Sequence, residues 1–121
     1  MAEAPADLAV LRRRLRDFAR ERDWEQFHTP KNLAMALIVE AAELLEHFQW
    51  LTPEQSGRLD RARRQAVEEE LADVLIYLVR LADRLGVDLL AAAGRKMAAN
   101  AEKYPAARAR GRADKYHRYR D

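Results

Sequence analysis

The chain has 121 residues, 49% of them hydrophobic and 35% charged, with 4 glycines, 4 prolines and no cysteine. This length suits one compact domain, and the composition favours long helices over sheet. The lack of cysteine excludes disulfides, zinc–thiolate sites and thiol catalysis, and a net charge of +2 gives no overall field that requires nucleic acid or a membrane.

Apolar residues at helical spacing predict four long helices and no strand, so the expected fold class is all-α. The predicted helices cover about residues 7–21, 30–48, 61–85 and 88–103. Thr29 and Pro30 form a capping pair at the start of the second helix, and Gly86 ends the third. A short extra turn is expected at Thr52 and Pro53.

The second and third helices are apolar around nearly their whole circumference, which indicates burial on most sides. In a chain of this size, that suggests the core of a four-helix bundle that also packs against another subunit. We therefore expect a helical domain over residues 1–105 that forms a homo-oligomer. Residues 106–121 are basic and lack an apolar stripe, so we expect a mobile or partner-dependent tail there.

Four carboxylates lie at matched spacing in these two apolar segments. Glu40 and Glu43 are three residues apart in "IVEAAELLEHF", and Glu70 and Asp73 are three apart, thirty residues further along, in "EEELADVLIYL". Each pair shares one helical face. If the two helices form an antiparallel hairpin, the pairs lie at overlapping levels, about 10–15 Å and about 14–18 Å from the loop.

Buried carboxylates are costly unless they are paired or bound to a cation. A single E-x-x-E is usually a solvated face or a salt-bridge partner, but two matched pairs flanked by leucine and valine favour a metal site. Oxygen ligands without cysteine or a required histidine suit Mg²⁺ or Mn²⁺. A di-iron site would need paired Glu-x-x-His motifs, and only Glu25 and His28 have that spacing, outside the helices expected to be buried.

The fourth predicted helix carries two cations and an amide on one face. Lys96, Asn100 and Lys103 recur at helical spacing, and together they could bind phosphate oxygens. A solvated lysine stripe explains the same pattern, and this motif alone favours that simpler interpretation.

These motifs together resemble the MazG-like, all-α nucleoside triphosphate pyrophosphohydrolases, and most closely their dCTP pyrophosphatase subgroup. The resemblance rests on "RDWEQFH", "P-x-N-L", "E-x-x-E-L-x-E-x-F-Q-W", "EEL-x-DVLIYL" and "K-M-x-x-N-x-x-x-Y-P". The motifs occur in the family's order and spacing over roughly residues 8–105. On the first helix, Leu15 stands where the subgroup often has a polar or histidine side chain near the base, so we allow for a broader pyrimidine range.

The resemblance implies Mg²⁺-dependent cleavage of a nucleoside triphosphate, dCTP or a modified dCTP, to the monophosphate and pyrophosphate. It implies a homotetramer in which the metal and the catalysis depend on Glu40, Glu43, Glu70 and Asp73. It also implies that the nucleotide is contacted by Trp24, Glu25, Gln26, Phe27, His28, Trp50 and Tyr77.

The residue types fit this reaction. A triphosphate and a carboxylate cluster repel each other, so divalent ions must bridge them and would lower the pKa of a water that attacks the α-phosphorus. One glutamate, for which Glu43 is a candidate, could orient that water. An apolar slot for a base could be formed by Trp24, Phe27, Trp50 and Tyr77, although core packing is the usual role of a lone aromatic residue.

Two other interpretations stay open. The tail, where arginine and lysine alternate with Tyr116 and Tyr119, could bind nucleic acid, or the acidic pairs could complement arginines in a dimerisation module. We favour the nucleotide hydrolase and expect neither nucleic acid nor a membrane as a partner. No stretch resembles a signal peptide or a membrane span, so we expect a soluble, cytoplasmic protein.

Overall fold

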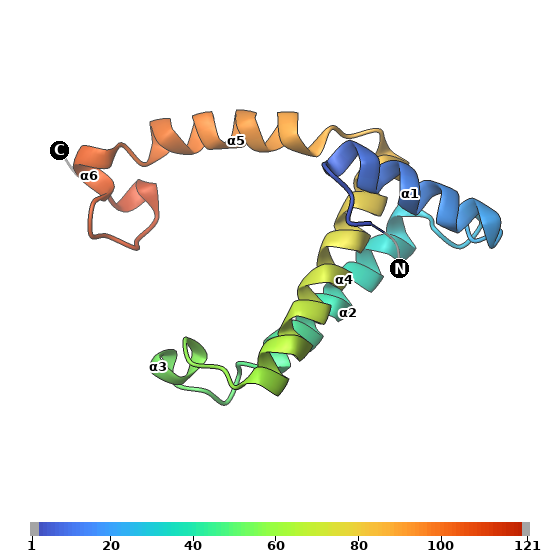
Figure 1. Cartoon of the computed structure of the whole chain (residues 1–121). Coiled ribbons are helices and arrows are strands. Elements are labelled where there is room, and N and C mark those ends of the chain that lie inside the picture. The colour runs from blue at the N-terminus through green and yellow to red at the C-terminus, as the bar shows by residue number, and fades with distance from the viewer. Residues whose placement is uncertain (1–2, 120–121) are drawn as a thin grey trace. The chain divides into compact units, whose positions relative to one another are not determined.

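The structure, a computed structural model, describes residues 3–119 as a series of helices that falls into two units, Met1–Val87 and Asp88–Asp121. The first unit holds α1 (Leu8–Glu21), α2 (Pro30–Glu46), the short α3 (Pro53–Ser56) and α4 (Arg61–Leu85) (Figure 1). The second holds α5 (Leu89–Lys103), α6 (Ala106–Ala109) and a single 3₁₀ turn at Tyr116–Arg118. No strand occurs in residues 3–119, so the all-α prediction is confirmed.

Side-chain caps start the helices where the sequence predicts them. The Thr29 hydroxyl accepts a hydrogen bond from the Asn32 backbone N–H at 3.2 Å and opens α2. The Asp60 carboxylate does the same for the Arg63 N–H at 2.8 Å and opens α4. α4 ends at Gly86, whose φ of 68° lies in the left-handed region that favours glycine.

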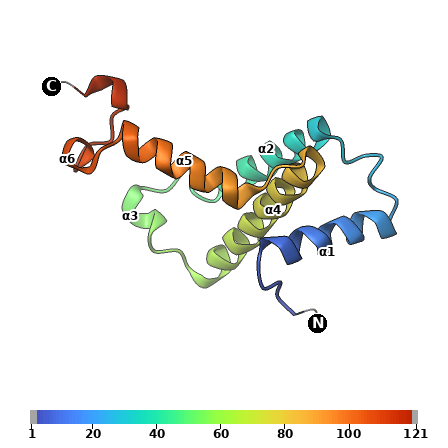
Figure 2. The same cartoon turned by 90° about the horizontal axis from the view of Figure 1, so that it is seen from above.

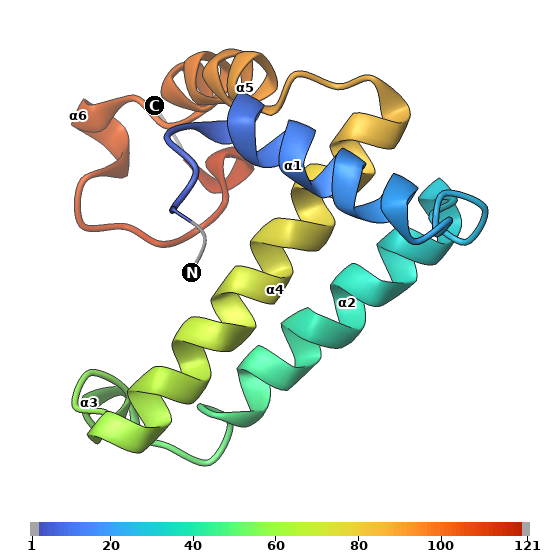
Figure 3. The same ribbon diagram turned by 45° about the vertical axis from the view of Figure 1, so that its right-hand side comes forward.

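The first unit is built on an antiparallel hairpin of α2 and α4, which lie side by side in Figures 1 and 3. α1 crosses the C-terminal end of α4, as Figure 3 shows, and Figure 2 gives the same helices from above. Leu33 of α2 and Val67 and Val79 of α4 fill the interior, together with two alanines near the crossing. The hairpin expected from the two acidic segments is therefore present.

Large apolar side chains remain exposed along the outside of this hairpin. On α4 they recur at helical spacing as Leu71, Leu75 and Leu78. On α2 they are Met35, Ile38, Val39 and Leu45. This is the excess apolar circumference that the sequence predicts, and the first unit alone does not cover it.

In the second unit, aromatic packing gives structure to the residues after α5. Tyr104, at the end of α5, contacts Tyr116 and Tyr119 edge-on, with ring centroids 6.0 and 5.8 Å apart. Arg112 forms an ion pair with Asp114 and lies over the Tyr119 ring at 4.6 Å. These contacts tie the basic segment to the end of α5, whereas the expected domain boundary between residues 105 and 106 stays a prediction.

Three of the four long predicted helices belong to the first unit, and α5 belongs to the second. A closed four-helix bundle would need α5 to pack against the hairpin of the first unit, and such a bundle stays a prediction. Within residues 3–119, no helix combines the length and apolar character needed to cross a membrane.

Gly86→Ala should lower the free energy of unfolding by about 1 kcal/mol, because alanine is strained at a φ of 68°. Gly94→Ala is the matched control: Gly94 lies inside α5, and a Cβ there would meet no atom of its own unit within 4 Å, so alanine should stabilise that helix by about 1 kcal/mol or less. Denaturant titrations at one protein concentration measure both. Equal effects of the two substitutions would contradict the role assigned to Gly86.

Candidate functional site

Three carboxylates converge where α2 and α4 pack against each other. Glu40 and Glu43 come from α2 and Glu70 from α4, and each offers an oxygen within 4.8 Å of the other two. The i, i+3 spacing places the two α2 residues on one face, and the hairpin brings Glu70 to their level. The structure thus brings together three of the four acids that the sequence singled out.

Two oxygens of this cluster lack the partners that buried polar atoms require. Glu40 Oε2 and Glu70 Oε2 are buried and accept no hydrogen bond from residues 3–119. An unsatisfied buried carboxylate oxygen is costly. A cation would supply the missing interaction, and a donor set made only of carboxylate oxygens suits a hard divalent ion. The residues present therefore fit a metal.

The electrostatics of the cluster show the same strain. Burial, followed by hydrogen bonding to and repulsion from Glu43, raises the pKa of Glu40 to about 7, and the charge of Asp73 adds to the shift. A bound cation would reverse this effect, because metal ligation favours the ionised carboxylate.

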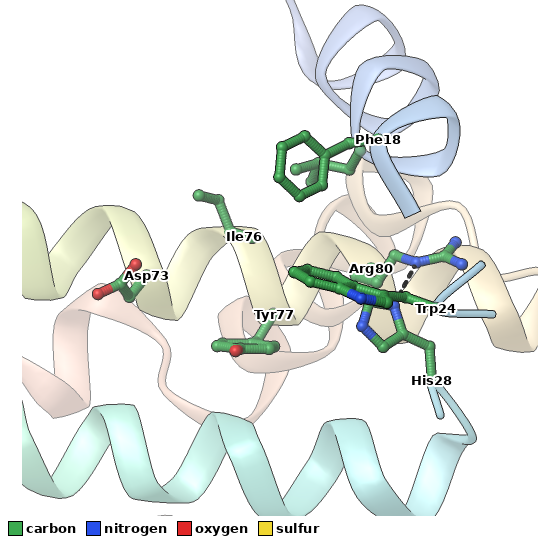
Figure 4. A pocket seen from close by; sticks show the side chains of 8 residues that line it. Phe18, Trp24, His28, Asp73, Ile76, Tyr77 and Arg80 are labelled. Atoms are coloured by element: carbon green, nitrogen blue, oxygen red, sulfur yellow. Dashed lines mark hydrogen bonds between the residues drawn. The ribbon is translucent and has the colours of Figure 1, made fainter. Parts of the chain in front are cut away.

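Asp73 follows Glu70 by one turn of α4, but its oxygens are not part of the converging trio. It lines an adjacent pocket instead, where Figure 4 shows its carboxylate at one end of the row of α4 side chains. Asp73 therefore links the acidic cluster to the pocket, and its role as a metal ligand stays a prediction.

The pocket has a volume of about 280 Å³, near the lower end for ligand sites. Its residues come from α1, the α1–α2 loop and α4 (Figure 4). They are Leu15, Phe18, Trp24, His28, Asp73, Ile76, Tyr77 and Arg80. The walls are mainly apolar and aromatic, and the size suits one ring system better than a whole nucleotide.

The α1–α2 loop is held in a tight conformation that presents Trp24. Asp23 takes a positive φ of 53°, and the Trp24 backbone N–H donates to the Ala19 carbonyl at 2.9 Å. The indole packs edge-on against Phe18, with centroids 5.7 Å apart, and lies 6.1 Å from the His28 ring. The Trp24 residue is still 42% exposed, so part of it is accessible to a ligand in the pocket.

The remaining aromatic and polar candidates lie elsewhere. Glu25 pairs with Arg20 at 3.2 Å, the Gln26 amide donates to Asp23, and Phe27 is exposed outside the pocket. Trp50 is 87% exposed and follows the opposite end of α2 from Trp24, roughly 25 Å away along the helix. Within one chain, the four aromatics expected to share a slot are therefore split, and only Trp24 and Tyr77 line the pocket.

Sequence reasoning missed a buried arginine in the wall of the pocket. Arg80 is only 3% exposed; its Nε donates to His28 Nδ1 and its Nη1 to Asp83 Oδ2, each at 3.1 Å. Asp83 also accepts two hydrogen bonds from Arg16 of α1, one of them from Nε at 3.0 Å. The signal was available, because Arg80 is a lone cation three residues after Tyr77 in an apolar stretch, with Asp83 three residues further on.

The arginines set the charge states around them. Hydrogen bonds from Arg16 lower the pKa of Asp83 below its ordinary value, so Asp83 is a carboxylate. Burial, followed by the positive charges of Arg80 and Arg84, lowers the pKa of His28 below its ordinary value, so the imidazole is neutral near pH 7.

Lys96, Asn100 and Lys103 are exposed on α5, which belongs to the second unit. The Lys103 ammonium lies 5.1 Å from the centre of the Tyr116 ring in the same unit. Contact of these three residues with a phosphate stays a prediction.

The fold and the site together define a class: a helical protein whose central hairpin carries a carboxylate cluster beside an aromatic pocket. Residues 35–118, well over half of the chain, match the MazG-like family. The chain belongs to the MazG-like family, which confirms the resemblance seen in its motifs.

Relatives and a solved structure agree with this assignment. The chain is 51% identical over 111 residues to dCTP pyrophosphatase 1 of Homo sapiens, and 50% identical to that of Rattus norvegicus. These matches cover 90% of this chain but 65% of each relative, just under two thirds of its length. The crystal structure of a pyrophosphatase from Archaeoglobus fulgidus is 42% identical, with a TM-score of 0.78, over 87% of this chain and 98% of that one.

Glu40→Gln should stabilise the metal-free protein at alkaline pH. The pKa of Glu40 rises on folding to about 7. The folded protein therefore loses stability as the pH increases from the ordinary pKa of a glutamate to this folded value, because a proton is released more easily from the unfolded chain. Glutamine does not ionise, so the variant does not lose this stability. The difference in free energy of unfolding should be small at pH 4 and largest above pH 7, in chelator, by denaturant titration.

Glu46→Gln, an exposed carboxylate on the same helix, is the matched control and should not reproduce this pH dependence. Parallel stability curves for wild type and Glu40→Gln would contradict the strained cluster.

Proposed function

We propose that this protein is a Mg²⁺-dependent nucleoside triphosphate pyrophosphohydrolase acting in nucleotide pool sanitation. Its substrate would be dCTP or a base-modified dCTP, cleaved to the monophosphate and pyrophosphate. The observation that carries the proposal is the trio Glu40, Glu43 and Glu70, with oxygens within 4.8 Å of one another, beside an aromatic pocket. The names of the relatives, dCTP pyrophosphatase 1 and a pyrophosphatase, support it.

The cofactor proposal is Mg²⁺, with Mn²⁺ as an alternative, held by Glu40, Glu43 and Glu70 with Asp73 beside them. The two unpartnered buried carboxylate oxygens support it. When bound, the ion would neutralise negative charge on phosphate oxygens and lower the pKa of a water molecule.

The order of the site residues along α4 supports one orientation of the bound substrate. Glu70 and Tyr77 are separated by roughly 10 Å along the helix axis, with Asp73 between them. A base stacked between the Trp24 and Tyr77 rings would thus have its sugar near Asp73 and its phosphates towards the carboxylate cluster. The apolar wall of Leu15, Phe18 and Ile76 would exclude water from the base.

The chemical step needs a water aligned with the α-phosphorus, opposite the departing pyrophosphate. A carboxylate can accept a hydrogen bond from that water, hold it in line and take its proton. Glu43 is our candidate, because Glu40 and Glu70 place oxygens in buried positions that suit ligation. His28 would hold the base edge, and Lys96, Asn100 and Lys103 remain candidates for the phosphates.

The alternative of a nucleic-acid-binding module rests on the basic tail. Part of its charge is already engaged internally, because Arg112 pairs with Asp114 and contacts Tyr119. A protein that binds nucleic acid through its tail would also have no need of the carboxylate trio. We therefore favour the hydrolase, and place it in the cytoplasm as part of the same proposal.

A screen for released pyrophosphate tests the proposed reaction. The four deoxynucleoside triphosphates, 5-methyl-dCTP and dCDP would be assayed with Mg²⁺, with Mn²⁺ and with chelator. We expect hydrolysis only with a divalent ion, the highest kcat/KM for dCTP or its methylated form, and little turnover of the diphosphate. A purine substrate at the top would overturn the dCTP assignment, and release of orthophosphate instead of pyrophosphate would overturn the reaction.

Glu40→Gln and Asp73→Asn should each abolish metal-dependent hydrolysis while circular dichroism shows an unchanged helical content. Loss of one carboxylate from such a site removes a negative charge that would hold the metal, and the metal is what would neutralise the phosphate oxygens. Glu46→Gln serves again as the control and should keep full activity. Near-normal turnover in either site variant would show that the metal site lies elsewhere.

We also propose that the protein assembles through the exposed apolar stripes of α2 and α4 into a homotetramer. The side chains of Leu71, Leu75 and Leu78 form one continuous stripe on α4, and a second copy of the hairpin would bury it. Self-association is supported by the apolar area, the count of four comes from the family resemblance, and neither depends on the substrate.

Sedimentation at micromolar concentration should give a mass near four times 14.0 kDa. Leu75→Glu should shift the protein towards smaller species, because it places a charge inside the buried stripe. Arg64→Glu, at an exposed polar position on the same helix, is the control and should leave the mass unchanged. A wild-type protein that sediments as a monomer would refute the assembly.

A further inference from the structure

Arg80, the buried arginine in the wall of the pocket, is hydrogen-bonded to one ring nitrogen of His28. The Arg80 Nε donates to His28 Nδ1 at 3.1 Å, as the dashed line in Figure 4 marks. A guanidinium offers only donors, so Nδ1 must present its lone pair. The proton of the neutral imidazole is then on Nε2, and His28 lines the pocket with an N–H donor available.

Two hydrogen bonds hold Arg80 in place, from Nε to His28 and from Nη1 to Asp83, each at 3.1 Å. Its buried Nη2 has no hydrogen-bond partner among residues 3–119 and lies 3.8 Å from a Glu25 oxygen, close enough for charge attraction. Asp83 is fixed in turn by Arg16, which approaches from α1. Because the Arg80 side chain is only 4% exposed, water cannot replace these contacts, and the guanidinium has little freedom to turn away from His28.

The charges facing His28 favour the same state of the ring. Arg80 and Arg84 are positive, Glu25 is negative, and burial together with the two arginines lowers the pKa of the imidazole. Arg84 acts only by its charge, since no hydrogen bond joins it to His28, whereas Arg80 acts by charge and by direct hydrogen bonding. Comparing substitutions of Arg80 and Arg84 therefore separates the effect of positive charge on His28 from the effect of the hydrogen bond on its tautomer.

We propose that Arg80 is a positioning residue that locks His28 as a neutral Nε2–H donor, so that the pocket selects bases that present a hydrogen-bond acceptor at that point. The role in base selection rests on the proposed nucleotide hydrolase. The lock on the tautomer does not, because it follows from the contacts alone. A site built around a fixed donor rejects a base that places its own donor there much more strongly than stacking does.

Nitrogen NMR of the imidazoles tests the lock directly. The chain has only 3 histidines, His28, His47 and His117, so assignment by single substitution is simple. In the wild type we expect His28 Nδ1 to show the shift of an unprotonated nitrogen and Nε2 that of a protonated one. A protonated Nδ1 at neutral pH would overturn the proposal, and this measurement needs neither substrate nor metal.

Arg80→Met tests the consequence, with Arg84→Met as the matched control. Methionine fills much of the same volume, and Asp83 keeps its pairing with Arg16, so no buried carboxylate is left alone. In Arg80→Met we expect a mixture of His28 tautomers, with discrimination among the four deoxynucleoside triphosphates reduced on the order of tenfold in kcat/KM, the scale of one lost hydrogen bond. Arg84→Met should keep both the tautomer and the ranking.

A double-substitution cycle distinguishes positioning from a general structural role. If Arg80 acts through His28, then Arg80→Met should have no further effect on the ranking of bases in a His28→Ala background. Additive losses, or an unchanged ranking in Arg80→Met, would overturn the proposal. If the wild type hydrolyses no nucleoside triphosphate, base selection fails together with the proposed function, while the NMR result still decides the tautomer lock.

Discussion

The first unit depends on one costly arrangement: the packing of α2 against α4 forces three carboxylates to within 4.8 Å of one another. Like charges at that distance repel, and burial deprives two of their oxygens of any partner in the described chain. Burial, followed by the interactions with Glu43, raises the pKa of Glu40 to about 7. Packing of Leu33, Val67 and Val79 must outweigh this repulsion in the metal-free protein, and a cation would turn the same cluster from a strain into a cross-link between the helices.

Most of the fold could be predicted from the sequence because helix capping and helix termination depend on residues that are close together in the chain. Capping by Thr29 and termination at Gly86 depend only on near neighbours, and the helices start and end within two residues of the expected positions. The acidic trio was also predictable, because i, i+3 spacing and an antiparallel hairpin bring Glu40 and Glu70 to one level. What could not be read from the sequence was contact between distant side chains: Arg16 with Asp83 across 67 residues, and Arg80 with His28 across 52.

The same reasoning explains why the aromatic residues were harder to place. A tryptophan has no partner-specific spacing, so sequence alone grouped Trp50 with Trp24, although α2 separates them within the chain. Trp24 reaches the pocket because an unusual backbone turn at Asp23 and a hydrogen bond to Ala19 aim it there. Neither feature has a reliable sequence signal. Tyr77 lines the pocket because it lies on α4, one turn after Asp73, where helical periodicity determines its direction.

The Arg16–Asp83–Arg80 group, in which the Asp83 and Arg80 side chains are buried and Arg16 is partly exposed, shows how ion pairs can serve orientation more than stability. Burying ion pairs gives little net stabilisation compared with well-packed apolar side chains. Apolar contacts would have been the simpler way to join α1 to α4 in a unit with few fully buried hydrophobic residues. Hydrogen bonds between charged groups, however, fix the orientation of their partners, whereas apolar contacts do not. Asp83 fixes the plane of the Arg80 guanidinium, the guanidinium fixes one nitrogen of His28, and the pocket receives a donor in a defined place. The helix crossing is thereby coupled to the chemistry of the pocket, so that a change in the angle between α1 and α4 would alter how His28 meets its ligand.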